Sequence, residues 1–260
     1  MKAGEPSGVS RETIRSGARP GGSAALLSES HLRMLKEIAR VAGVPLPSRF
    51  RPACEAFLAE LTKWNKRINL ISMRDRTRIV ERHVLDSLCL LAYEPRLAGK
   101  HVLDVGPGAG FPGLVLAMWD VSAQVTLVES RSKPVAFLRA VRRSIGLENV
   151  KIVHARLESV AGLGQTPPVD IVTSRAVGGT LRLAEHAAPL LKPCGAVVVY
   201  AARKLKGGAH TAPSVSVHDA AILKRMGYSA ESMTPLWQSL TSLLILRKLD
   251  QSEPTGSLAG

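Results

Sequence analysis

Short apolar runs alternate with helical patterns along the chain from about residue 100 onward. Runs that are apolar throughout are typical of strands buried on both faces, and their alternation with helices is typical of a doubly wound parallel sheet in the α/β class. We expect strands near 101–105, 124–129, 150–154, 169–173 and 195–201, with helices near 111–119, 132–145, 180–190 and 216–226. The last apolar run, 240–246, follows Pro235 too closely for a crossover helix. It should therefore pair antiparallel with a short strand near 228–233.

Helical periodicity dominates the preceding segment instead. One helix is expected from Ser28 to Ala42, a second from about Pro52, and a third from Arg76 to Tyr93. We therefore divide the chain into a flexible basic tail (1–28), a helical cap (29–95), an α/β domain (96–249) and a second flexible tail (250–260).

The composition is that of a globular protein with an acidic partner. The 260 residues carry a formal charge of +14, and 45% of them are hydrophobic. Such a charge favours a polyanion such as nucleic acid. No apolar run approaches the length of a membrane span, no signal peptide is visible, and the cysteines and histidines are scattered. We therefore expect a cytoplasmic chain without a metal or a membrane partner.

A glycine-rich turn follows the first expected strand and carries most of the chemistry. Asp104 lies in the strand, and Gly106, Gly108 and Gly110 form the turn before the next helix. A strand, a glycine turn and a helix make a crevice in which a nucleotide can lie against the backbone. Glu129 ends the second strand at about the distance of 20 residues expected for a carboxylate that binds ribose hydroxyls. The pattern indicates an adenosine-containing cofactor.

The glycines can be read in two frames, which leaves the cofactor open at this point. From Gly108 to Gly113 the chain matches the G-x-G-x-x-G dinucleotide fingerprint. From Asp104 it reads D-x-G-x-G-x-G, which resembles motif I of class I S-adenosylmethionine-dependent methyltransferases. Asp104 favours the second frame, because a carboxylate beside a pyrophosphate is costly but suits an ammonium group. A tight turn that binds no ligand is the ordinary alternative.

Four segments in order carry a family resemblance. They are Leu61-Thr-Lys-Trp-Asn-Lys-Arg-Ile-Asn-Leu70, Arg82-His-Val-Leu-Asp-Ser87, the glycine motif 104–113, and Ser174-Arg-Ala176. Over about residues 50–205 the chain resembles the RsmG (GidB) family of bacterial methyltransferases, which modify a guanine N7 of 16S rRNA in the small ribosomal subunit. The resemblance implies a class I Rossmann-like methyltransferase fold, S-adenosylmethionine as cofactor and 16S rRNA as partner. We expect the protein to work as a monomer.

The resemblance also assigns roles to individual residues. It implies that the cofactor is held by Asp104, Gly106, Gly108, Gly110, Phe111, Glu129, Leu157, Glu158 and Arg175. Leu157 and Glu158 would flank the adenine, although they could simply begin a short helix. Arg175 would lie where cofactor and substrate meet and act by positioning, although it could instead pair with Asp170 or Glu185.

Other motif residues have ordinary alternatives as well. His83 and Asp86 could pair with each other, Trp64 could be a core anchor, and Asn65 could brace a loop. Pro107 and Pro134 depart from the family's usual residues. Because a guanine N7 carries no proton, the reaction needs no general base.

RNA contacts are expected from basic side chains. The residues proposed for this role are Lys63, Lys66, Arg67, Arg82, Lys133, Lys204 and Lys206. A second cluster comprises Arg131, Lys133, Arg139, Arg142 and Arg143. Two rival functions remain: an NAD-dependent oxidoreductase that uses the Gly108 frame, and a non-catalytic ribosome-binding protein.

Overall fold

The computed structural model describes residues 26–164, 166–175, 179–202, 204–206, 209–211, 215–235 and 241–249, without the side chains of 202–211. Its centre is a seven-stranded sheet in the order β3-β2-β1-β4-β5-β9-β8. The strands are β1 (His101–Val105), β2 (Gln124–Glu129), β3 (Val150–His154), β4 (Val169–Ser174), β5 (Leu191–Ala202), β8 (Tyr228–Met233) and β9 (Thr241–Lys248). The first five pair in parallel, and β9 runs antiparallel to both β5 and β8. This confirms the expected doubly wound sheet with an antiparallel last strand.

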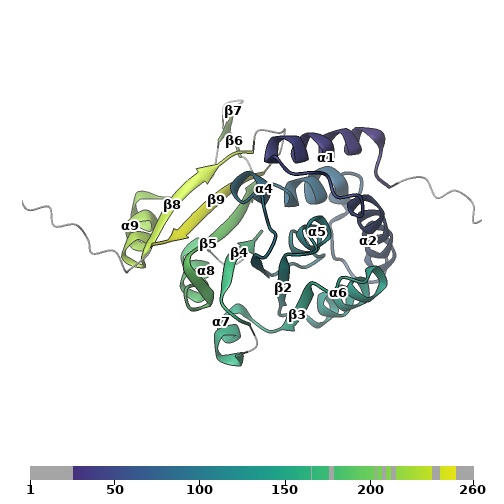
Figure 1. Cartoon of the computed structure of the whole chain (residues 1–260). Helices are drawn as coiled ribbons and strands as arrows, with labels where there is room; N and C mark the ends of the chain where they lie inside the picture. Colours follow the sequence, from purple (N-terminus) through teal and green to yellow (C-terminus); the bar gives the residue numbers. More distant parts are fainter. Residues whose placement is uncertain are drawn as a thin grey trace, which may run out of the picture.

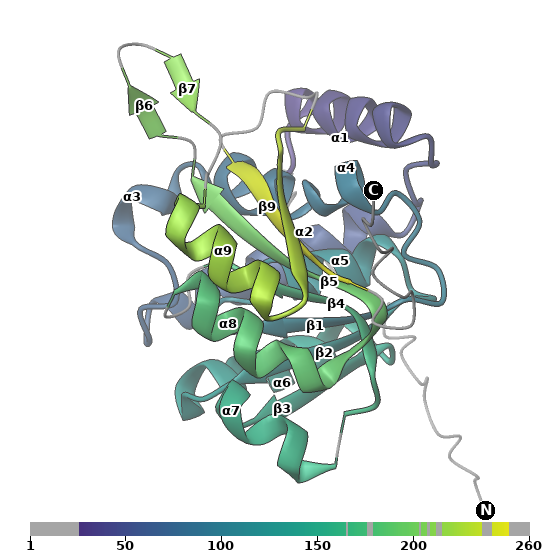
Figure 2. The ribbon, with the colours of Figure 1, turned by 90° about the vertical axis from the view of Figure 1, so that its left-hand side faces the viewer.

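Helices cover both faces of this sheet (Figure 1 and Figure 2). One face carries α1 (Glu29–Ala42), α2 (Phe50–Asn65), α4 (Leu90–Tyr93), α5 (Gly113–Trp119) and α6 (Ser132–Ile145), whose buried side chains form one apolar cluster with β1, β2, β5 and β9. The other face carries α7 (Leu157–Val160), α8 (Thr180–Ala187) and α9 (Val217–Arg225). Strand residues alternate between the two clusters, as Val102 and Leu103 of β1 do. The central strand β1, whose five residues are all buried, is therefore covered on both faces, which explains its largely apolar sequence.

The expected third helix is wrong as a single element. The segment 76–93 is divided into the end of α3 (Met73–Arg76), a π-helix (Val80–Leu85) and α4. In a π-helix the backbone hydrogen bonds join residues five apart instead of four. Over this short segment the apolar side chains still recur at close to the spacing of an α-helix. The spacing of apolar residues alone could not reveal this interruption.

Two further differences concern the ends of the chain and of the sheet. A two-stranded hairpin, β6 (Lys204–Lys206) with β7 (Ala209–Thr211), follows β5 and was not expected. The predicted tail 1–28 lies outside the described residues up to residue 25, and its last part is packed: Leu27 is buried and Ser28 caps α1. The predicted tail 250–260 lies outside the described residues.

Among the helices that the structure describes, none has both the length and the apolar character needed to cross a bilayer.

Candidate active site

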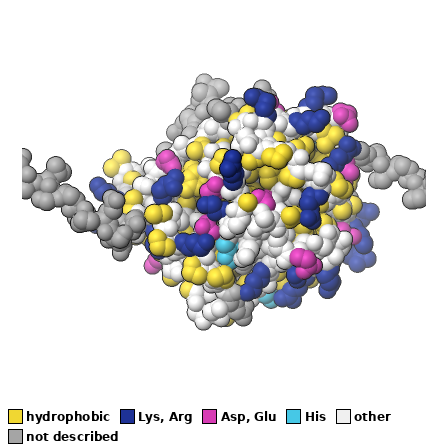
Figure 3. Space-filling view, in the orientation of Figure 1, with side chains coloured by type: hydrophobic (Ala, Val, Ile, Leu, Met, Phe, Trp, Pro, Cys, Tyr) yellow, Lys and Arg dark blue, Asp and Glu magenta, His cyan; other side chains and the backbone are white. Residues whose placement is uncertain are grey.

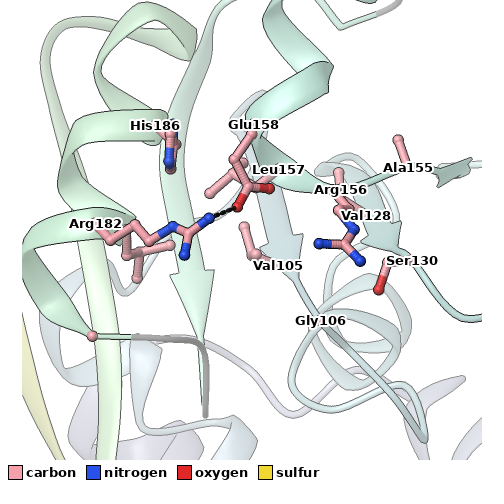
Figure 4. A pocket seen from close by; sticks show the side chains of 12 residues that line it. Val105, Gly106, Val128, Ser130, Ala155, Arg156, Leu157, Glu158, Arg182 and His186 are labelled. Carbon is pink, nitrogen blue, oxygen red and sulfur yellow. Dashed lines mark hydrogen bonds and ion pairs between the residues drawn. The ribbon is translucent and has the colours of Figure 1, made fainter.

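A pocket lies at the carboxyl edge of the sheet, where the strand order reverses between β1 and β4. In doubly wound sheets ligands bind at this switch point. The pocket has a volume of about 260 Å³ and is bounded by the ends of β1 and β2, by the start of α7 and by α8 (Figure 4). Gly106, Leu157 and Glu158, three residues expected to hold a cofactor, line it.

The glycine turn needs its glycines for two separate reasons. Gly106, Gly108 and Gly110 have φ values of 67°, 54° and 94°, which L side chains rarely adopt. At Gly110 a Cβ would also collide with the Leu114 side chain. Gly106 is exposed at the pocket, so its backbone is accessible to a ligand. Phe111 is buried beneath the turn against Phe57 of α2, at 5.2 Å between ring centroids.

Asp104 lies under this turn and is fully buried. Its Oδ2 accepts a hydrogen bond from the Gly113 amide at 2.7 Å, which ties β1 to the first turn of α5. Its Oδ1 has no hydrogen-bond partner among the described residues. Burial raises the pKa of Asp104 to about 7. The carboxyl group is therefore both a brace for the turn and a charge without full compensation.

Glu129 stands at the end of β2 beside the same turn. Its Oε2 accepts from the Gly108 amide at 3.1 Å, and its Oε1 accepts from the Arg131 amide at 2.9 Å and from Arg131 Nε at 3.2 Å. The side chain is only 3% exposed. These contacts aim the carboxylate at the turn, as a carboxylate that binds ribose hydroxyls requires.

Arg175 does not make either of the ion pairs that we considered for it. Its guanidinium donates to the Arg82 and His83 carbonyls at 3.3 and 3.2 Å, and its Nη1 lies 3.1 Å from His83 Nδ1. It also lies over the Phe111 ring at 5.8 Å from the centroid. Asp170 pairs instead with Lys192, at 2.8 Å. Arg175 thus joins the end of β4 to the π-helix and to the glycine turn.

The motif around His83 attaches the cap to the sheet. His83 stacks on Phe111 at 4.9 Å, and burial, reinforced by Arg175, lowers its pKa to about 4. Asp86 accepts a hydrogen bond from Thr241 of β9 at 2.7 Å. Tyr200 of β5 donates to the Ser87 carbonyl at 2.8 Å. His83 and Asp86 therefore both contact the α/β domain, His83 through Phe111 and Arg175 and Asp86 through Thr241.

The signature at the end of α2 also has a structural role. Trp64 packs edge-on against Phe137 of α6 at 5.8 Å, as a core anchor does. Asn65 Oδ1 accepts from the amides of Leu70 and Ile71 at 2.7 and 3.0 Å, and so braces the following loop. These two residues therefore take the ordinary alternatives that the sequence left open.

The basic side chains predicted to contact RNA fall into four places. Lys63, Lys66 and Arg67 are exposed at the end of α2, and Lys63 and Arg67 line a pit with Ala140 of α6. Lys133 begins the exposed side of α6, a helix without acidic residues. Figure 3 shows Lys and Arg side chains along the edge where Figure 1 places α2 and α6. Arg82 pairs with Asp75 at 2.9 Å. Lys204 and Lys206 belong to β6, but their side chains are outside the description.

Sequence reasoning missed two groups of residues at the site. From the sequence, Tyr200 and Thr241 were predicted only as strand residues, although both contact the π-helix segment. Arg182 of α8 lines the pocket, and the sequence analysis gave it no role. A tyrosine in a buried strand is the one available signal, because its hydroxyl must find a partner. Among the described residues, no three His, Cys, Asp or Glu side chains are grouped as a metal site requires.

Comparisons with known proteins agree with this geometry. Residues 51–232 match the family model GidB, rRNA small subunit methyltransferase G. The chain is 39% identical over 161 residues to the ribosomal RNA small subunit methyltransferase G of Chloroflexus aggregans, covering 62% of this chain and 67% of that protein. It is 40% identical over 144 residues to the protein of the same name from Serratia proteamaculans, covering 55% and 67%.

A solved structure supports the fold. A SAM-dependent methyltransferase from Aquifex aeolicus superposes with a TM-score of 0.51 at 18% identity, covering 73% of this chain and 98% of that one. At this identity the likeness concerns the fold alone. With the family model matching most of the chain and both bacterial relatives agreeing, the chain belongs to the rRNA small subunit methyltransferase G (GidB) family.

Proposed function

We propose that this protein transfers a methyl group from S-adenosylmethionine to a guanine N7 of 16S rRNA. The observation that carries the proposal is the crevice at the switch point, where the glycine turn and Glu129 meet in a chain of this family. We further propose that it acts as a cytoplasmic monomer on the small ribosomal subunit, and that the reaction uses no metal ion.

The residues at the crevice fit the cofactor. Exposed backbone at Gly106 lets a ligand approach, and Glu129 presents acceptor oxygens where ribose hydroxyls would donate. The carboxyl group of Asp104, whose Oδ1 has no hydrogen-bond partner among the described residues, would supply negative charge for the ammonium group of the methionine part. Leu157 and Glu158 begin α7 and also line the pocket, so both of their expected roles are compatible.

Methyl transfer to a guanine N7 requires the protein mainly to align the base with the methyl group. When bound, S-adenosylmethionine supplies a methyl group already activated by its sulfonium. The guanine N7 has an unshared pair and no proton, so the chain has only to align the base and exclude water. Arg175 lies beside Phe111, where its guanidinium would hold a phosphate or the methionine carboxylate. Burial keeps His83 neutral at physiological pH, so it adds no cation beside Arg175.

The RNA partner is supported by the charge distribution. Lys133 at the start of α6 lies near Glu129 because α6 follows β2 directly, and the basic end of α2 packs on the same helix. Clustered Lys and Arg side chains neutralise phosphates and release counterions. Phosphate contacts along this edge would hold the RNA while the target base enters the site.

The dinucleotide alternative fits the same crevice less well. Asp104 lies under the turn that would face a pyrophosphate, where its negative charge is costly. Pro112 precedes α5 and offers no N–H to a phosphate at the helix start. Neither feature opposes a cofactor that carries positive charge.

The test is transfer of labelled methyl to small subunits that lack the modification. We expect label at a guanine N7 with the unaltered protein and strong loss with Glu129→Ala, because the ribose loses its acceptors. Arg40→Gln on α1, far from the crevice, serves as the control variant and should label normally. Label without a change in Glu129→Ala would refute the proposed cofactor site. RNA binding without any transfer would favour the non-catalytic alternative.

A further inference from the structure

One face of α8 forms the wall of the pocket opposite α7. Gly179, Arg182, Leu183 and His186 line the pocket and recur at intervals of three and four residues, so they share this face. Figure 4 shows Arg182 and His186 on this wall. Arg182 Nη2 donates to Oε1 of Glu158 at 2.7 Å. This ion pair crosses the pocket and joins its two walls, and no motif of the family resemblance includes Arg182.

The floor beneath the ion pair is apolar. Val105, Val128, Leu157 and Leu183 line the pocket and are each less than 10% exposed. An apolar floor with a few polar groups at its rim is the usual make-up of a site for a flat heterocycle. Glu129, which we assign to the ribose, ends β2 next to Val128 and Ser130 of this lining. The adenine would therefore lie over this floor.

We propose that Arg182 is a cofactor-binding residue whose guanidinium, held by Glu158, covers the adenine of S-adenosylmethionine from the side facing solvent. The proposal rests on the proposed function. A guanidinium is planar and weakly hydrated, and it stacks on aromatic faces better than an ammonium group does. Glu158 would fix the plane of the guanidinium above the floor, which makes Glu158 a positioning residue as well as a rim acceptor.

A role in stability does not account for this ion pair. The Arg182 side chain is 63% exposed, and exposed pairs contribute little to the free energy of unfolding. The pKa of Glu158 lies below its ordinary value, first because its own backbone N–H donates to the carboxylate and then because of Arg182. Glu158 is therefore ionised at neutral pH, and the pair is formed when a ligand arrives.

The experiment is calorimetric titration of the whole chain with S-adenosylhomocysteine. We expect Arg182→Gln to weaken binding about three- to fivefold, the size of an exposed cation–π contact. The affinity of Arg182→Lys should lie between those of the unaltered protein and Arg182→Gln, because an ammonium group can pair with Glu158 but has no planar face. Arg40→Gln is the matched control, since Arg40 and Glu37 form an exposed ion pair of 2.6 Å on α1. It should bind like the unaltered protein.

The outcomes separate this inference from the proposed function. If Arg182→Gln binds as tightly as Arg40→Gln, Arg182 is only a solvated side chain and the inference is overturned alone. Tighter binding by Arg182→Gln would also overturn it, because the ion pair would then obstruct the pocket. If the unaltered protein binds no S-adenosylhomocysteine at all, the proposed function fails and takes this inference with it.

Discussion

Asp104 is a carboxyl group in a place where a charge is costly. Burial raises its pKa to about 7, so about half of the molecules carry a proton there at neutral pH. An ammonium group nearby favours the charged form and lowers this pKa. The proposed cofactor should therefore expel the proton when it binds.

The prediction is that S-adenosylmethionine binding at pH 7 releases roughly half a proton per molecule. Calorimetry in buffers of different ionisation enthalpy measures this number. At pH 9 the release should vanish, because Asp104 has already lost its proton. Asp104→Asn, which keeps an acceptor for the Gly113 amide, should release none at either pH. Equal release by both proteins would show that Asp104 does not sense the cofactor.

The same group makes a prediction for stability without ligand. The folded pKa lies above the unfolded value of about 3.9, so the folded protein binds more protons between these two values. The free energy of unfolding should therefore decrease as pH rises from about 4 to about 7, by up to about 4 kcal/mol from this group. Urea unfolding of Asp104→Asn across this range should lack that part of the decrease. A parallel pH dependence in the two proteins would contradict it.

At the scale of elements, side-chain contacts attach the π-helix segment to the sheet. Tyr200 donates to the Ser87 carbonyl, and in Tyr200→Phe that buried carbonyl loses its partner. We expect the free energy of unfolding to fall by about 1–3 kcal/mol and amide exchange to accelerate in residues 80–93.

Tyr228→Phe is the matched control for this contact. Tyr228 is also buried and donates to the Ala184 carbonyl, but on the other face of the sheet. Tyr228→Phe should lower the free energy of unfolding by a similar amount and leave amide exchange in residues 80–93 unchanged. If both variants accelerate exchange there equally, the effect is global and Tyr200 does not specifically hold this segment.

The elements that could be predicted from sequence are those whose signal is local. Strands β1 to β3 were predicted with their observed bounds, because each is a short and mainly apolar run, although Lys151 and His154 of β3 are exposed. The glycine turn and Glu129 could be located because spacing along one βαβ unit fixes them. The family itself was identified from four short motifs, and the family model confirms it.

What could not be predicted depends on contacts between distant residues or on backbone detail. Arg175 reaches His83 across 92 positions, and Tyr200 reaches Ser87 across 113. Sequence spacing cannot show which carbonyl a guanidinium will meet at such separations. The interruption of the 76–93 helix arises from shifted hydrogen bonds that leave the apolar spacing almost unchanged.

At the scale of the whole molecule, the charge of +14 matters most for how RNA is held. Lys66 and Arg67 at the end of α2 are exposed, and no ion pair is found for them among the described residues. Phosphate contacts by such side chains release counterions, so binding weakens as salt increases. The slope of log affinity against log salt therefore reports the number of phosphate contacts, and it does not depend on the chemistry at the crevice.

We predict that Lys66→Gln with Arg67→Gln lowers the slope of log affinity for 16S rRNA against log salt by about 1.4–1.8 in magnitude, since each phosphate contact contributes roughly 0.7–0.9. Filter binding between 50 and 200 mM salt, roughly the range where such losses are large, measures it. Arg33→Gln with Lys36→Gln on α1 removes the same charge from exposed positions elsewhere. If the α1 variant lowers the slope equally, RNA binding depends only on the net charge of the protein and not on the end of α2. If only the α2 variant does so while S-adenosylmethionine binding is kept, the end of α2 is a phosphate-binding surface distinct from the cofactor pocket.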